Sequence, residues 1–233
     1  MKMKYRLACV LVLGFAVTSW GQQNAPPADK PADSGPSLAA TMQFIQEKLT
    51  EQGQVAWAET RSNQPEITYR TILLITDVMS DPDACTLYIT GKSDNTIELQ
   101  KGFTLKQGGP LTADDLLSHT VETDTISFKQ VEHIGVTNVQ DVHNQSFVRS
   151  AHPEIKATVT PPVFIVTLWA SNAVVATSHT STTKGKQALV EKDITSKSGV
   201  ISIRNEETAN KVAKAMAHAV KLCGGGVTKK DLF

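Results

Sequence analysis

The chain predicts an α+β domain, in which a strongly bent antiparallel sheet or a partly open barrel packs against an N-terminal helix and a C-terminal amphipathic helix. Three observations support this fold class. Apolar residues recur at helical spacing at both ends of the predicted domain, and they alternate with polar residues in between. Turn-forming stretches rich in Gly, Pro, Asn and Asp separate the alternating runs. Short, closely spaced strands of this kind favour an antiparallel sheet folded over on itself.

The first 21 residues are typical of an export signal. A basic start is followed by an apolar run from Leu7 to Val17 and by small residues before a cleavage point after Gly21. Cleavage after Thr18 is the alternative. A lipidated cysteine would follow the apolar run, whereas Cys9 precedes most of it, so we expect Cys9 to leave with the signal. Residues 1–21 are therefore interpreted as a signal peptide, and the protein as periplasmic or extracellular.

The remaining chain divides into a linker, one domain and a tail. Residues 22–36 carry four prolines and no large apolar side chain, so they bury too little surface to offset chain entropy and are expected to be a disordered linker. Residues 37–223 fit a single globular α+β domain of ordinary size, and residues 224–233 a flexible tail. No second apolar run is long enough to span a membrane, so we expect no transmembrane segment after signal removal.

The first helix of the domain is expected to begin after Ser37 and to end at Gly53. Its apolar residues recur at steps of four, three and four, at Leu38, Met42, Ile45 and Leu49. Ser37 is a suitable N-cap and Gly53 a suitable stop.

After Gln54 the period changes to two, which indicates strands. The expected strands are Val55–Trp57, Ile67–Ile75, Cys85–Ile89, Thr96–Gln100, Thr125–Val131, Ile134–Val139, Ser146–Arg149, Val163–Ala170, Ala173–Thr177 and Val200–Arg204. Turns are expected at Asn63–Pro65, Ser80–Asp83 and Gly91–Asn95. The stretches Gly108–Thr120 and Ser178–Ser198 fit neither pattern.

The last helix has the clearest signals. Asn205 can cap it, and two glutamates follow in the first turn, where the helix dipole favours negative charge. One face carries Val212, Ala215, Met216, Ala219 and Cys223. Glycine at 224 then ends the helix, because it accepts the left-handed conformation of a C-terminal cap.

This closing segment, Ile201–Gly226, which contains Leu222-Cys-Gly-Gly, resembles the end of a group of uncharacterised exported bacterial proteins, with a weaker similarity at Pro161–Val166. That group implies no activity. At the level of the fold, a strand that feeds one amphipathic helix through Arg204–Glu207 is similar to pleckstrin-homology-like domains. Such an analogy carries no function. The helix at Leu38 departs from that pattern, and an exported bacterial protein would not meet the phosphoinositides that it implies.

Charge and cysteine content limit the partners. Without residues 1–21 the chain keeps 20 of its 23 basic residues and all 23 acidic ones, and this balance argues against a nucleic-acid partner, which requires a clustered basic surface. Cys85 and Cys223 remain after cleavage. In an oxidising compartment the pair is expected to form a structural disulfide, with two buried free thiols as the alternative.

No catalytic, cofactor-binding or metal-binding set is predicted. The six histidines have no second ligand at a metal-site spacing, and Gly91-Lys92-Ser93 lacks the upstream glycine of a phosphate-binding loop. Trp57 and Trp169 lie in strand patterns and are expected to pack in the core. A binding platform is the alternative for both.

The sequence thus predicts an exported, non-enzymatic binding or structural module without a cofactor, whose partner is a protein or small ligand of the cell envelope. The alternative is a periplasmic hydrolase with a spatially assembled site. Asp141 and His143 would contribute to it, because residues two apart on a strand share a face. An envelope scaffold is a third possibility.

Overall fold

Local signals set the boundaries of most helices and strands. The computed structural model describes residues 35–101, 118–183 and 189–226, with their side chains except at 118 and 179–193. The helices are α1 (Leu38–Gln52), α2 (Val139–Arg149), α3 (Glu206–Leu222) and a short 3₁₀ turn, η1 (Phe128–Gln130). The strands are β1 (Gln54–Arg61), β2 (Gln64–Asp81), β3 (Thr86–Leu99), β4 (Ser118–Ser127), β5 (His133–Asn138), β6 (Ala157–Thr160), β7 (Phe164–Trp169), β8 (Val175–Thr183), β9 (Leu189–Ser196) and β10 (Ser198–Ile203).

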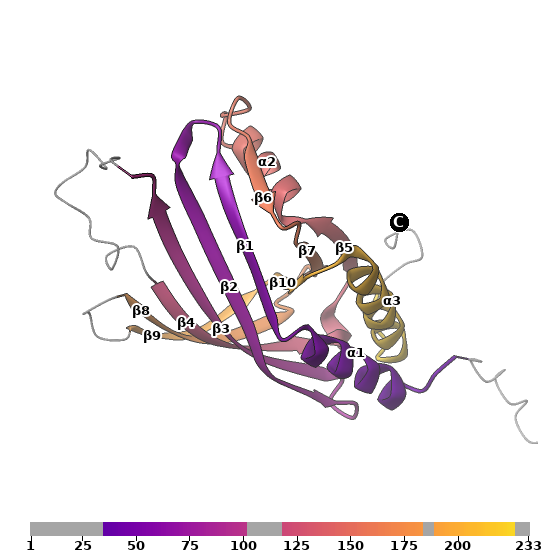
Figure 1. Cartoon of the computed structure of the whole chain (residues 1–233). Helices are drawn as coiled ribbons and strands as arrows, with labels where there is room; N and C mark the ends of the chain where they lie inside the picture. The colour runs from indigo at the N-terminus through magenta and orange to yellow at the C-terminus, as the bar shows by residue number, and fades with distance from the viewer. Residues whose placement is uncertain (1–34, 102–117, 184–188, 227–233) are drawn as a thin grey trace, which may run out of the picture. The chain divides into compact units, whose positions relative to one another are not determined.

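The strands form two antiparallel sheets (Figure 1). The larger sheet has the order β6-β1-β2-β3-β4-β8-β9, and the smaller has the order β10-β7-β5. Bulges interrupt β2 between Ile75 and Asp77 and β8 between Thr177 and His179, and bulges bend the strands that carry them. The α+β class and the antiparallel pairing are confirmed. The sheets do not close into a barrel.

Helix α1 begins and ends where the sequence predicts. The Oγ atom of Ser37 accepts a hydrogen bond from Ala40 N at 3.3 Å, and Gly53 ends the helix at a φ of 55°, a conformation that glycine adopts without strain. Met42, Ile45 and Leu49 are fully buried. This apolar face packs on α3 and β2.

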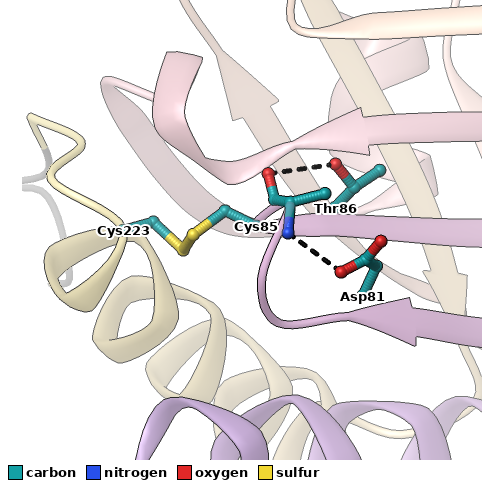
Figure 2. The surroundings of a disulfide bond; sticks show 5 residues. Asp81, Cys85, Thr86 and Cys223 are labelled. Carbon is teal, nitrogen blue, oxygen red and sulfur yellow. Dashed lines mark hydrogen bonds between the residues drawn. A yellow bond between two sulfur atoms is a disulfide. The ribbon is translucent and has the colours of Figure 1, made fainter.

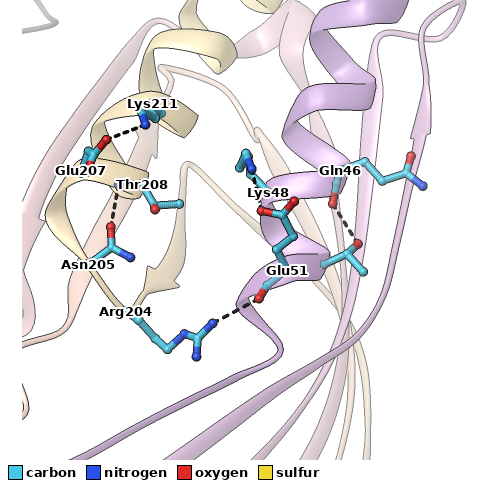
Figure 3. A network of polar contacts seen from close by, with 9 residues as sticks. Gln46, Lys48, Glu51, Arg204, Asn205, Glu207, Thr208 and Lys211 are labelled. Atoms are coloured by element: carbon cyan, nitrogen blue, oxygen red, sulfur yellow. Dashed lines mark hydrogen bonds and ion pairs between the residues drawn. The ribbon is translucent and has the colours of Figure 1, made fainter.

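Helix α3 is also capped as predicted, by Asn205 Oδ1, which accepts from Thr208 N at 2.8 Å. Polar contacts tie its start to the end of α1 (Figure 3). Arg204 Nη2 donates to Glu51 O at 3.1 Å, and Arg204 N donates to the side chain of Gln52 at 3.1 Å. The two predicted terminal helices therefore form one layer.

The predicted cysteine pair lies at bonding distance, with Sγ–Sγ of 2.12 Å and Cα–Cα of 5.9 Å. Cys85 occupies the turn between β2 and β3 at a φ of 59°, and the bond joins this turn to the end of α3 (Figure 2). Ala84 N donates to Asp81 Oδ1 at 2.9 Å within the same turn. The disulfide thus fastens the longest hairpin of the larger sheet to the helical layer.

Two clusters of buried side chains make up the core. The larger one lies between α1, α3, the smaller sheet and the ends of β3 and β4 that flank Cys85. The smaller one joins β1, α2, β6 and β7 through Val55, Val139, Val159, Val163 and Ile165. The second cluster holds α2 against the larger sheet.

The turn predicted at Gly91–Asn95 is wrong, because these residues lie inside β3. The two strands predicted on either side of it, Cys85–Ile89 and Thr96–Gln100, are parts of this one strand. Gly91 pairs with Ile75 on one side and Glu122 on the other, directly beside the bulge of β2. Hydrogen-bonding neighbours on both sides outweigh the turn propensity of the polar residues, and the glycine marks a bulge rather than a reversal.

The strand predicted at Ser146–Arg149 is also wrong, because these residues form the last turn of α2. Asn138 caps this helix through Oδ1, which accepts from Asp141 N at 2.7 Å. Val139, Val142, His143 and Phe147 recur at helical spacing on the side that faces the sheet. A short segment with few apolar residues gave too little periodicity to separate helix from strand.

Most of the predicted signal peptide, linker and tail lies outside the described residues. Backbone hydrogen bonds hold the first residues of the predicted tail. Gly225 N donates to Val220 O at 2.8 Å, and Gly226 N donates to Val131 O at 3.2 Å. A Cβ at Gly225 would lie 2.8 Å from Phe128 O. Glycine is required there because the backbone approaches η1 closely.

Candidate functional site

The candidate site begins with the alternation of β1. Trp57, Glu59 and Arg61 point to the same face of the strand, and Val55 of the smaller core cluster shares that face. We call this the inner face of the larger sheet. Glu59 is only 3 % exposed, which is rare for a glutamate unless its charge is paired.

Helix α2 covers the edge of the larger sheet beside β1. Strand β6 is that edge, and two side chains one turn apart on α2 accept its outward N–H groups. Asn144 Oδ1 accepts from Ala157 N at 2.8 Å, and Gln140 Oε1 accepts from Val159 N at 3.1 Å. Unpaired edge groups invite association with other chains. The amide side chains of α2 therefore protect the edge and also fix the position of the helix along it.

This position brings His143 of α2 over Glu59 of β1. His143 Nδ1 lies 2.5 Å from Glu59 Oε2, and Arg61 Nε donates to Glu59 Oε1 at 2.7 Å. The two atoms are in close contact, but the geometry of this approach is not that of a hydrogen bond.

The electrostatics of the group favour an ionised Glu59. Burial by itself raises the pKa of this carboxyl, but the contacts and charges of His143 and Arg61 outweigh it, so that the pKa lies below its ordinary value of 4.5. Both carboxylate oxygens are engaged in these contacts. Glu59 thus holds two cationic or donor groups, one from its own strand and one from α2.

Two aromatic rings hold the guanidinium of Arg61. Its Cζ atom lies 4.3 Å from the centre of the Tyr69 ring and 5.5 Å from that of Phe147, distances at which a cation is attracted by the ring face. The Tyr69 hydroxyl donates to Gln64 Oε1 at 2.9 Å. Arg61 is consequently held by an acid and by rings from both β2 and α2.

These side chains line an open pocket of about 400 Å³, within the size range of small-molecule sites. We call it the α2 pocket. It is lined by Trp57, Glu59, Arg61, Tyr69, Arg70, Thr71, Asn95, Thr96, Ile97 and His143. Thr71 Oγ1 donates to Asn95 Oδ1 at 2.9 Å across the β2–β3 pair. Arg70 pairs with Glu98 at 2.6 Å, and both of these side chains are about half exposed.

The predicted pair Asp141 and His143 does not come together. Both lie on a helix, where residues two apart point in different directions. Asp141 is exposed and accepts from Asn138 Nδ2 at 2.6 Å, whereas His143 faces the sheet. The carboxylate that His143 contacts is Glu59, 84 residues earlier in the chain.

Of the other predicted residues, only Trp57 lies at this pocket. The Cys85–Cys223 bond belongs to the larger core cluster. In the described part of the chain, no group of three His, Cys, Asp or Glu residues could hold a metal ion, and no helix there is long and apolar enough to cross a membrane. Trp57 lines the pocket. Trp169 is 45 % exposed, so its expected place in the core is wrong.

Sequence reasoning missed Glu59 and Arg61. The available signal was a glutamate at an inward position of a predicted strand, two residues after Trp57 and four after Val55. A charged residue in an inward register needs a partner. The sequence does not indicate that α2 supplies this partner, because part of α2 is predicted to be a strand.

Comparison with protein-family models, with curated proteins and with solved structures finds no match to this chain. Its function therefore has to be argued from the α2 pocket itself.

Proposed function

We propose that this chain is an exported, non-enzymatic binding module whose ligand occupies the α2 pocket. The observation that carries the proposal is the buried carboxylate of Glu59, which holds Arg61 and His143 at the wall of a pocket of about 400 Å³. Burying a charge is costly, so a buried carboxylate that orients a cation at a pocket wall favours a role in binding. Preorganised polar groups beside aromatic walls are typical of small-molecule sites.

Export is part of the same proposal. The basic and apolar pattern of residues 1–21 and the disulfide pair both favour an oxidising compartment. The N-terminus of the protein recovered from its native host should be Gln22. A mature protein that still begins at Met1 would contradict export by this signal.

The likeness to pleckstrin-homology-like domains remains a proposal about the fold. It is based on the direct connection from β10 into α3 through Arg204 and Asn205. It carries no lipid-binding function to this chain.

A fragment screen on the full chain tests the proposed site. Heteronuclear NMR should detect small molecules that shift the indole N–H signal of Trp57. Replacing Thr71 with Phe should narrow the pocket and weaken such binding by about tenfold or more, since an added ring occupies the ligand's space. Thr68→Phe is the matched control, because it places the same ring on the opposite face of the same strand. Equal binding to both variants, or shifts confined to other surfaces, would contradict the proposal.

A hydrolase is the second candidate, with Glu59 in place of Asp141. The favouring observation is the contact of Glu59 with Nδ1 of His143, because a carboxylate at one ring nitrogen can orient the other, Nε2, as a general base. Turnover of ester or amide substrates that His143→Gln abolishes, with the fold intact, would support it. Absence of turnover across a broad hydrolase panel would contradict it.

A further inference from the structure

The groups that the α2 pocket offers to a ligand are mainly hydrogen-bond donors. Its one buried acid, Glu59, has both oxygens engaged and a side chain only 4 % exposed. In the described contacts of Arg61, only Nε has a hydrogen-bond acceptor, and neither terminal nitrogen has one. Guanidinium nitrogens that have no acceptor in the protein need water or a ligand to supply one.

Asn95 adds a second donor at the opposite wall. Its Oδ1 atom accepts from Thr71, which fixes the orientation of the amide and leaves Nδ2 as the group without an acceptor among the described contacts. The ring of His143 adds a third group. Its Nδ1 atom contacts Glu59, and the side chain is 35 % exposed.

The charges of the wall agree with this pattern. Arg61 and His143 both contact the carboxylate of Glu59. A cationic ligand would find no unpaired acid there, whereas an anion would find the fork of Arg61, a geometry that suits a carboxylate. The apolar part of the wall, Trp57, Tyr69 and Ile97, suits a flat apolar body.

From these contacts we propose that the α2 pocket binds a small carboxylic acid with an apolar, ring-containing body. The carboxylate lies against Arg61, the body lies against Trp57 and Tyr69, and Asn95 supplies a further donor at the opposite wall. The inference is based on the proposed binding function and specifies the ligand class of the same site. No bond is made or broken.

The test compares three probes of one shape on the full chain: naphthylacetate, its neutral amide naphthylacetamide, and the cation naphthylmethylammonium. Affinities are measured by titration of the Trp57 indole signal. We expect naphthylacetate to bind at least about tenfold more tightly than the amide, since a charge-assisted hydrogen bond contributes this much. The cation should bind more weakly than the amide.

Two variants locate the anion. Arg61→Gln should abolish the preference for the acid and leave the amide affinity nearly unchanged. Because Arg61 also contacts Glu59, this variant risks a loss of stability. Asn95→Asp avoids the risk: the residue is exposed, and an aspartate oxygen still accepts from Thr71. This variant should weaken the binding of naphthylacetate by about tenfold and leave the affinity for naphthylacetamide unchanged. Arg149→Gln, at the exposed end of α2, is the control and should change neither affinity.

The outcomes separate the two proposals. Equal binding of acid and amide at Trp57 overturns the anion preference and leaves the pocket as a binding site. If the Asn95→Asp and Arg61→Gln variants still bind the acid more tightly than the amide, the proposed anion site is also overturned. Probes that leave the Trp57 signal unchanged, or that shift only other surfaces, overturn both.

Discussion

At the scale of single residues, the central feature is a buried glutamate with two partners. Glu59 is reached by Arg61 at 2.7 Å and by His143 at 2.5 Å. The pKa of Glu59 is lowered, because these partners outweigh its desolvation. A lowered carboxyl pKa is a statement about stability, because the unfolded chain then binds a proton more readily than the folded one.

The stability of the protein should therefore fall in acid partly through Glu59. The contribution is fully present above the ordinary pKa of 4.5, decreases as the pH falls below that value, and is lost once the pH passes the lower folded pKa. Urea unfolding between pH 3 and 7 measures it. Glu59→Gln should show a shallower acid loss than the wild type and, at neutral pH, a free energy of unfolding lower by about 1–3 kcal/mol.

Glu98→Gln is the matched control for this experiment. Glu98 Oε1 lies 2.6 Å from Arg70 Nε, as short a distance as in a strong ion pair, but both side chains are about half exposed. Exposed pairs contribute little. An equal loss in both variants would contradict the special role of Glu59.

At the scale of elements, α2 determines the site, because it closes the sheet edge and supplies His143 and Phe147. The side chains of Gln140 and Asn144 fix it against β6. The register of these two contacts decides which residue of α2 faces Glu59. Edge protection and construction of the pocket are thus functions of one helix.

Asn144→Ala should leave the N–H group of Ala157 without its acceptor. We expect a loss of about 1–2 kcal/mol in the free energy of unfolding, the usual result for a partly buried donor without a partner. Hydrogen exchange at the Ala157 amide should accelerate, while exchange in α3 stays unchanged.

The control is Gln145→Ala, whose side chain accepts only from Arg149, at 3.3 Å, among the described contacts. It should alter neither stability nor exchange by a measurable amount. If Asn144→Ala behaves in the same way, the docking of α2 by its amide side chains is wrong.

At the scale of the whole molecule, the disulfide joins elements that lie 138 residues apart in the chain. A loop of this length is expected to stabilise by about 4–5 kcal/mol through the lost entropy of the unfolded chain. Its position between the β2–β3 turn and the end of α3 also fixes the helical layer to the larger sheet.

Reduction should therefore lower the free energy of unfolding by about 4–5 kcal/mol. Urea unfolding with and without reductant measures the change, and intact mass before and after reduction shows the bond itself. The double variant Cys85→Ala with Cys223→Ala should not respond to reductant. An unchanged unfolding midpoint of the wild type on reduction would show that the two thiols are free.

Much of this fold could be predicted where local signals are strong. Both terminal helices have good caps and several apolar turns, so that Ser37, Gly53 and Asn205 mark their ends correctly. The cysteine pair could be predicted from the number of cysteines that remain once the signal peptide is removed. These features depend on neighbouring residues or on composition.

The candidate site could not be predicted in the same way. Glu59 and His143 are far apart in sequence, and only the pairing of β6 with β1 and the docking of α2 on β6 bring them together. The polar run after Gly91 was mistaken for a turn, because pairing with two neighbouring strands leaves no local pattern. Non-local contacts thus decide the site, while local contacts decide the helices around it.

The most direct test of this account is a double-mutant cycle between Glu59→Gln and His143→Gln, measured by urea unfolding at neutral pH. It asks whether these two residues hold α2 over β1 and so form the pocket. We predict a coupling free energy of about 1 kcal/mol, modest because His143 is partly exposed. Additive effects of the two substitutions, with no coupling, would contradict the contact on which the pocket depends.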